Sequence, residues 1–228
     1  IYMRRRIDKE KYGLRAVYDG KLLIKVLNLS VWSMFHAFIS VAPWFLFFVA
    51  IEHLGKMELA ISNITRSVSA LFFVIANSFA VTTGSLVSNA IGAGEGKELF
   101  SICRKILKLG YAIGFPLVGI ALFCNQWIVG LYTNNELLIE LAFAPFIVML
   151  LNYTFALPGY VYLNAVGGTG KTRITFLFQV TTTVVYLVYL YWLSYYTRTS
   201  LAVYLTAEYL FVIMLAVQSV IYLKVKHY

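Results

Sequence analysis

One histidine and two serines stand at helical spacing in the first long apolar stretch of the sequence. Ser33, His36 and Ser40 are three and four residues apart, which places their side chains on one face of a helix. An imidazole beside hydroxyls could relay protons or activate a serine, although a hydrogen-bonded histidine without a chemical role is the simpler interpretation. Nucleophilic catalysis also needs an orienting acid, and this stretch has none. We therefore predict that the protein is not an enzyme, and an intramembrane enzyme is kept only as a distant alternative.

Hydroxyl and amide side chains form polar faces on two later apolar stretches. Such faces either line a hydrated cavity or hold neighbouring helices together through close packing and hydrogen bonds. The candidates for lining a substrate cavity are Ser33, His36, Ser40, Asn77, Ser78, Thr82, Asn152, Tyr153 and Asn164.

Acidic side chains, which usually bind the coupling ion of an ion-driven transporter, are scarce in the apolar stretches. Glu208 is the one acid well inside such a stretch. No His-Glu-x-x-His or paired-cysteine pattern supplies metal ligands, so we predict no metal site and no cofactor. The GGTGKT run over residues 167–172 is similar to a phosphate-binding loop, but Ala165 occupies the position of its first glycine. An apolar helix also precedes it, so a nucleotide site is not expected.

The composition shows which solvent surrounds most of the chain. Of 228 residues, 61% are hydrophobic and 13% are charged, and the mean hydropathy is +0.77. A soluble domain carries about 25% charged residues because its surface faces water. The chain is therefore expected in lipid, and the composition excludes a soluble domain, a disordered segment, a disulfide framework and a nucleic-acid module.

Six apolar stretches are each long enough to cross a bilayer, which takes about 20 residues. They predict an all-α integral membrane protein, with a basic cytoplasmic linker over residues 1–25 and a six-helix transmembrane lobe over residues 26–228. The predicted spans are residues 26–51, 67–91, 109–131, 141–164, 174–196 and 201–223.

Basic residues lie mainly on one side of these spans. Most of the 19 Lys and Arg residues fall before the first span, between the second and third, between the fourth and fifth, or after the sixth. By the positive-inside rule both termini are cytoplasmic. The net charge of +9 then reflects topology and contact with anionic lipid, and needs no nucleic acid. Arg66 is expected at a helix entrance, which leaves no basic side chain deep in a span.

All four prolines fall inside predicted spans. Proline in a membrane helix frees a backbone carbonyl and bends the axis, which can serve a moving helix or only a static kink. The hinge candidates are Pro43, Pro116, Pro145, Pro158 and Gly159.

Two segments carry a family resemblance. Residues 82–94 read TTGSLVSNAIGAG, and residues 163–173 read LNAVGGTGKTR. In order and spacing both resemble the multidrug and toxic compound extrusion (MATE) transporters, which have a helix ending in "vGq.lGAG" and a later "lrG.Gdtr" turn. Gly167 and Lys171 depart from the usual Arg and Asp of that turn. The glycines expected to shape the ends of helices are Gly92, Gly94, Gly167, Gly168 and Gly170.

The resemblance implies half of a twelve-helix transporter. Two six-helix lobes would enclose the substrate, this chain would be the C-terminal lobe, and the N-terminal lobe of the same transporter would be its partner. Some family members place cation-binding acids in the first and fourth helices of this lobe, but residues 34–38 and 155–157 contain none here. The resemblance therefore assigns the site of the coupling ion, H⁺ or Na⁺, to the N-terminal lobe.

The expected function is multidrug efflux by cation antiport, with alternating access between the lobes. Small organic substrates, including cationic ones, and membrane lipid are the expected partners, and the bacterial inner membrane is the expected location. A lipid-linked saccharide flippase of the same superfamily is the alternative, and it would need basic charge in the cavity. A structural membrane subunit is a more distant one.

Overall fold

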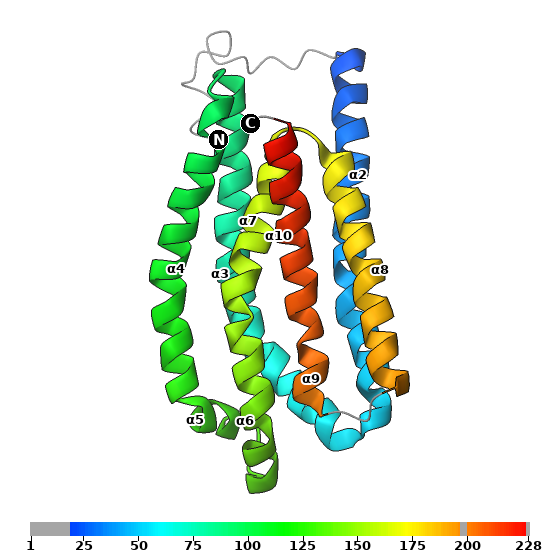
Figure 1. Ribbon diagram of the computed structural model, residues 1–228, viewed down its shortest axis with the longest axis vertical. Coiled ribbons are helices and arrows are strands. Elements are labelled where there is room, and N and C mark those ends of the chain that lie inside the picture. Colours follow the sequence, from blue (N-terminus) through cyan, green and yellow to red (C-terminus); the bar gives the residue numbers. More distant parts are fainter. Residues whose placement is uncertain (1–18, 197–199, 227–228) are drawn as a thin grey trace, which may run out of the picture.

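The computed structural model of the chain describes residues 19–196 and 200–226. Residues 1–18 of the predicted linker, and Arg198, lie outside this part. Every regular element in the described part is a helix: α2 (Gly20–Ile51), η1 (Glu52–Leu54), α3 (Lys56–Gly92), η2 (Gly96–Glu98), α4 (Leu99–Phe123), α5 (Asn125–Gly130), α6 (Glu136–Leu151), α7 (Tyr153–Gly168), α8 (Thr172–Tyr196), α9 (Leu201–Leu205) and α10 (Ala207–Val225) (Figure 1).

Six helical segments of the described chain are long and apolar enough to cross a membrane. The fourth is formed by α6 and α7 together, and the sixth by α9 and α10. The predicted all-α membrane fold with six spans is therefore confirmed. Large apolar side chains also cover the outside of the bundle, such as Phe38 (79% exposed) and Phe123 (92% exposed), as expected for a surface that faces lipid.

Several helices extend beyond the predicted spans, whose ends were placed at the first charged residue. The second helix begins at Lys56 rather than residue 67, and the third begins at Leu99 rather than residue 109. The first begins at Gly20, where the Asp19 carboxylate accepts hydrogen bonds from the amides of Lys21 and Leu22. The helices thus continue past charged residues, and we expect these charged ends to lie in the polar interface of the bilayer.

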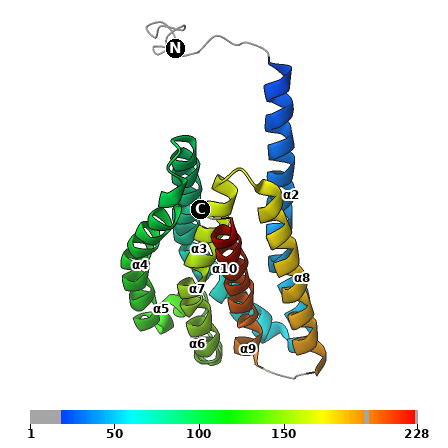
Figure 2. The same ribbon diagram turned by 45° about the horizontal axis from the view of Figure 1, so that its top comes forward.

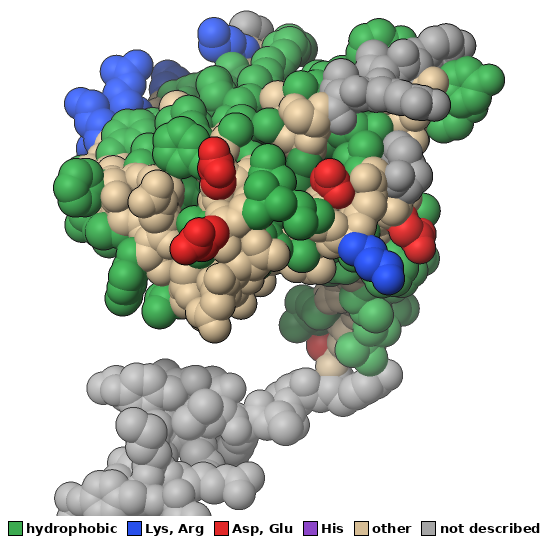
Figure 3. Space-filling view, turned by 90° about the horizontal axis from the view of Figure 1, so that it is seen from below, with side chains coloured by type: hydrophobic (Ala, Val, Ile, Leu, Met, Phe, Trp, Pro, Cys, Tyr) green, Lys and Arg blue, Asp and Glu red, His purple; other side chains and the backbone are tan. Residues whose placement is uncertain are grey.

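Most of the described basic residues gather at one end of the bundle, whereas Lys56 lies at the other end and Arg66 within α3. Elements that begin or end there carry Lys21, Lys25, Lys97, Arg104, Lys105, Lys108, Lys171, Arg173, Lys224 and Lys226 (Figure 1). At the opposite end, acidic side chains stand among hydrophobic and uncharged ones (Figure 3). The elements there include the acids Glu52, Glu58, Glu136 and Glu140. The charge asymmetry read from the sequence is therefore also an asymmetry in space.

The helices divide unequally around α7. This helix packs against α3, α10, α4 and α8, whereas α2 packs chiefly on α8 and makes few contacts with α3. Figure 2 shows α2 and α8 side by side, on the other side of α10 from α4. The space between α2 and the central helices is where the polar cavities lie.

The fourth span is interrupted between α6 and α7, at Asn152. Six residues later, Pro158 has no N–H to give the carbonyl of Thr154. The Tyr111 hydroxyl of α4 supplies that hydrogen bond instead, at 2.7 Å. Gly159 packs so closely on α10 that a Cβ there would lie 2.6 Å from the Val212 carbonyl oxygen. The structure thus shows close packing at this hinge candidate; Pro43, Pro116 and Pro145 also lie within helices.

The five glycines expected at helix ends differ in their surroundings. Gly94 and Gly170 have φ values of +81° and +78°, a region that favours glycine. Gly168 lets α7 approach α3, since a Cβ there would lie 2.5 Å from the Gly84 carbonyl oxygen. Gly92 is the last residue of α3, and Gly167 is the last residue but one of α7. A Cβ at either position would meet no tight contact.

A double-mutant cycle tests the bond that replaces the one lost at Pro158. Tyr111→Phe should destabilise the protein by about 1 kcal/mol, because the Thr154 carbonyl then has no donor. In a Pro158→Ala background the helix regains its own N–H, so the same substitution should cost much less. Thermal unfolding of the four proteins checks this. Equal costs of Tyr111→Phe in both backgrounds would contradict the account.

Candidate functional site

A polar cavity of about 430 Å³ lies between α2 and the helices α3, α7, α8 and α10, and is here called the central cavity. Its walls combine aromatic rings with amide, imidazole, hydroxyl and carboxylate groups. The lining residues are His36, Ser40, Val41, Pro43, Trp44, Phe73, Asn77, Tyr160, Leu163, Asn164, Gln179, Glu208 and Phe211. An apolar wall with a few convergent polar groups is the usual composition of a small-molecule site.

A second cavity, of about 440 Å³, lies toward the end of the bundle where α7 turns into α8. We call it the turn-end cavity. It shares His36, Leu163 and Asn164 with the central cavity. The other lining residues include Ser33, Gly84, Ser85, Gly167, Gly168, Thr172 and Thr175. The two cavities are thus neighbours, with His36 and Asn164 placed between them.

His36 is positioned by the register of α2. Its Nε2 is buried and has no hydrogen-bond partner among the described residues. Opposite it, the Asn164 amide of α7 donates to the Tyr160 carbonyl at 2.9 Å. A ring nitrogen to which no described residue hydrogen-bonds, at the junction of two cavities, is available to a water or a ligand.

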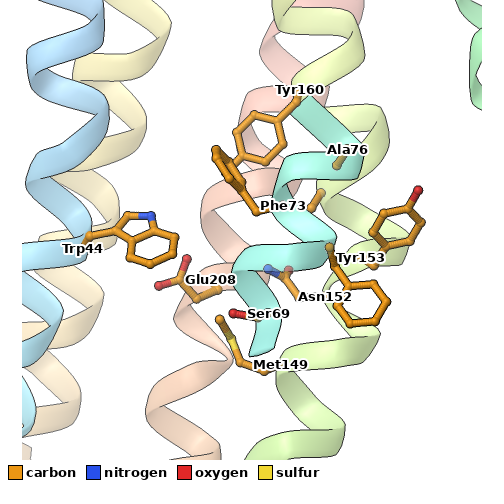
Figure 4. A pocket seen from close by; sticks show the side chains of 11 residues that line it. Trp44, Ser69, Phe73, Ala76, Met149, Asn152, Tyr153, Tyr160 and Glu208 are labelled. Atoms are coloured by element: carbon orange, nitrogen blue, oxygen red, sulfur yellow. The ribbon is translucent and has the colours of Figure 1, made fainter. Parts of the chain in front are cut away.

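A third cavity is much smaller, about 40 Å³, and lies beside the break between α6 and α7. Figure 4 shows Asn152, Ser69, Trp44 and Glu208 around it. The Asn152 side-chain oxygen is buried there without a partner in the described part of the chain. A cavity of this size can hold ordered water, which would satisfy that oxygen.

A buried ion pair borders the central and the small cavity. Arg66 Nη2 of α3 donates to Glu208 Oε1 of α10 at 2.5 Å, and the Tyr186 hydroxyl of α8 donates to the same oxygen at 3.0 Å. The Arg66 guanidinium lies 4.0 Å from the Phe47 ring centroid and 5.0 Å from that of Trp44, both on α2. Four helices therefore meet at this pair.

The expectation for Arg66 was wrong. It was expected at a helix entrance, but it lies within α3 and is 2% exposed. Its charge is tolerated because the Glu208 carboxylate and the aromatic faces replace the water that it loses. The inference that no basic side chain lies deep in a span must be corrected accordingly.

Seven of the nine predicted cavity residues line one of the three cavities, and two line none of them. Ser33, His36, Ser40, Asn77 and Asn164 line the two larger cavities, and Asn152 and Tyr153 line the small one.

Ser78 and Thr82 line none of these cavities. They are exposed on α3 and donate to the carbonyls of Val74 and Ser78, both at 2.8 Å. Tyr153 has a packing role as well, because its hydroxyl donates to the Gly110 carbonyl of α4 at 2.9 Å.

Sequence reasoning missed most of the aromatic wall and the polar face of α8. Thr175, Gln179, Thr182 and Tyr186 recur at spacings of four, three and four, and all four are buried. This is the same kind of signal that indicated the polar face of the second helix. The aromatic residues Trp44, Phe73 and Phe211 gave no such signal, because aromatic side chains are common throughout the sequence.

A six-helix lobe with polar cavities inside the bundle is the kind of unit from which repeat-built membrane transporters are assembled. The MatE family model matches residues 33–192. The chain therefore belongs to the MatE family of transporters, as the resemblance of its motifs indicated. No curated protein matches the sequence significantly.

Solved structures share the fold at low sequence identity. A MATE structure in complex with MaL6 has a TM-score of 0.77 at 17% identity, and the match covers 92% of this chain and 48% of that one. A MOP superfamily transporter from Pyrococcus furiosus gives 0.73 at 18% identity, covering 89% and 45%. An outward-facing multidrug resistance MATE family transporter gives 0.72 at 17%, covering 91% and 47%. The chain spans just under half the length of these structures.

Proposed function

We propose that this chain is the C-terminal lobe of a secondary active exporter that removes small organic compounds in exchange for H⁺ or Na⁺. The central cavity is the observation that carries this proposal. Its volume of about 430 Å³ and its mixed aromatic and polar walls suit amphipathic molecules. Family membership supports transport, and one of the structurally similar proteins is described as a multidrug resistance transporter.

The lining residues divide the work of binding. Trp44, Phe73 and Phe211 offer apolar ring faces, while His36, Asn164 and Gln179 offer hydrogen-bonding groups that fix orientation. A partner lobe of the same transporter would complete the path across the bacterial inner membrane. Residues 34–38 and 155–157, where some family members have cation-binding acids, contain none in this chain. We therefore place the coupling-ion site in the N-terminal lobe, and propose no resident cofactor or metal.

A flippase for lipid-linked saccharides is the second candidate. Arg66 supplies the basic charge inside a span that the sequence analysis did not find. However, Arg66 is 2% exposed and paired with Glu208, so it offers no free positive charge to a pyrophosphate group. This geometry favours the exporter.

Efflux from cells or vesicles that contain the complete transporter tests the proposal. His36→Ala and Asn152→Ala each remove a polar group that lines a cavity, and each should slow efflux about fivefold, the effect of one hydrogen bond. Ser78→Ala is the matched control, since Ser78 lines none of the described cavities. Imposed H⁺ and Na⁺ gradients, varied separately, identify the coupling ion.

Two results would count against the exporter. One is the absence of gradient-driven efflux of any organic compound from well-expressed protein. The other is gradient-independent movement of lipid-linked saccharides, which would establish the flippase instead.

A further inference from the structure

The Arg66 guanidinium occupies surroundings that resemble a binding site for a cation. Ring centroids of Phe47, Trp44 and Phe48 lie 4.0, 5.0 and 5.4 Å from its central carbon. A carboxylate, from Glu208, completes the surroundings at 2.5 Å. Aromatic faces with an acid are the arrangement by which proteins recognise organic ammonium and guanidinium ions. Here the bound cation belongs to the chain itself.

Glu208 and Arg66 differ in their access to the cavities. The Glu208 side chain is 12% exposed and lines both the central and the small cavity, whereas the Arg66 side chain is 2% exposed and lines neither. Trp44 lies between the two environments, because it contacts the guanidinium and also lines the central cavity. Figure 4 shows the Glu208 carboxylate directed toward Trp44. A molecule in the central cavity can therefore reach the carboxylate without passing Arg66.

The hydrogen-bonding capacity of the Arg66 guanidinium is only partly used. One nitrogen, Nη2, donates to Glu208, while Nε and Nη1 have no hydrogen-bond partner among the described residues. A buried guanidinium with most of its donors unused is a poorly satisfied charge. Another cation can therefore compete with Arg66 for the Glu208 carboxylate.

We propose that Glu208 is the cation-recognition residue of this lobe, and that Arg66 is a tethered competitor that neutralises it when no ligand is bound. The ligand class is an organic ion with an ammonium or guanidinium head and an apolar body that contacts Trp44, Phe73, Tyr160 and Phe211. The pair then sets the charge preference of the central cavity. This inference rests on the proposed function, because it assumes that the central cavity receives the transported compound.

Binding to the purified complete transporter tests the proposal with two probes of equal shape. Phenyltrimethylammonium is a cation, and tert-butylbenzene is its neutral carbon isostere. Glu208→Gln should weaken binding of the cation at least about tenfold, because the coulombic attraction between the carboxylate and the quaternary ammonium is lost. The affinity for the neutral probe should change less than about twofold. Glu140→Gln is the control, because Glu140 is exposed and lines none of the described cavities. Isothermal titration calorimetry gives both dissociation constants.

Removing the competitor should have the opposite effect. Arg66→Met should tighten binding of phenyltrimethylammonium about tenfold. The double variant Arg66→Met with Glu208→Gln should bind the two probes with equal affinity. If Arg66→Met does not fold, Glu208→Gln alone still tests the proposal. This variant should fold, because its glutamine oxygen can accept the hydrogen bonds from Arg66 and Tyr186. An unchanged cation affinity in Glu208→Gln, or an equal loss for both probes, would overturn the proposal. If the proposed function fails but this inference holds, the variants will differ in binding of the cation while the protein shows no gradient-driven efflux.

Discussion

Replacing Arg66 with methionine should lower the free energy of unfolding by about 3–5 kcal/mol. The expected loss is large because the substitution leaves the Glu208 carboxylate, which borders two cavities but is largely buried, without its cation. It also removes the contacts with the rings of Phe47 and Trp44. Thermal unfolding of the purified protein, followed by the loss of monodisperse material, measures the effect.

The double variant Arg66→Met with Glu208→Gln is the control for this experiment. It removes both charges together, so it should be considerably more stable than Arg66→Met alone. The Tyr186 hydroxyl can still donate to the glutamine oxygen in place of the carboxylate. A double variant as unstable as the single one would mean that packing, rather than charge pairing, determines the cost.

The second large effect is expected where α7 crosses α10. Gly159→Ala should destabilise the lobe by about 1–3 kcal/mol, because its Cβ would lie 2.6 Å from the backbone oxygen of Val212. Backbone at a helix crossing cannot move aside as the end of a flexible side chain can. The two helices must therefore separate, and the neighbouring contacts of α7 are lost with them.

Gly119→Ala is the matched control for Gly159→Ala. Gly119 also lies within a helix, α4, but a Cβ there would meet nothing within 4 Å. The substitution should be neutral or stabilising by up to about 1 kcal/mol, because alanine favours the helix more than glycine does. Similar melting temperatures for the two variants would exclude the crossing as the source of the effect.

The number and type of the spans could be predicted because lipid imposes a simple rule on composition. A helix that crosses a bilayer needs a long apolar stretch, and each of the six spans has such a stretch in the sequence. The ends of the helices follow a different rule. Backbone hydrogen bonds continue past charged residues, so Arg104, Lys105 and Lys108 are helical although the apolar stretch begins after them.

The central cavity was predictable only in part. Periodic polar residues on one helix, such as Ser33, His36 and Ser40, indicate a face, and this face does border the cavities. The Arg66 and Glu208 pair joins positions 142 residues apart, and no local spacing connects them. The break at Asn152 also gave no signal, since neither proline nor glycine stands at that position. Both features depend on how whole helices pack.

The short distance between Arg66 and Glu208 has an electrical consequence. Moving one elementary charge through the membrane potential involves about 2.3 kcal/mol per 100 mV. Two opposite charges 2.5 Å apart that move together cancel almost all of this work. As long as the pair stays intact, its displacement in a rocking lobe is therefore nearly insensitive to voltage. Any voltage dependence of the transport cycle must then arise from the transported ions, from other charged residues, or from separation of this pair.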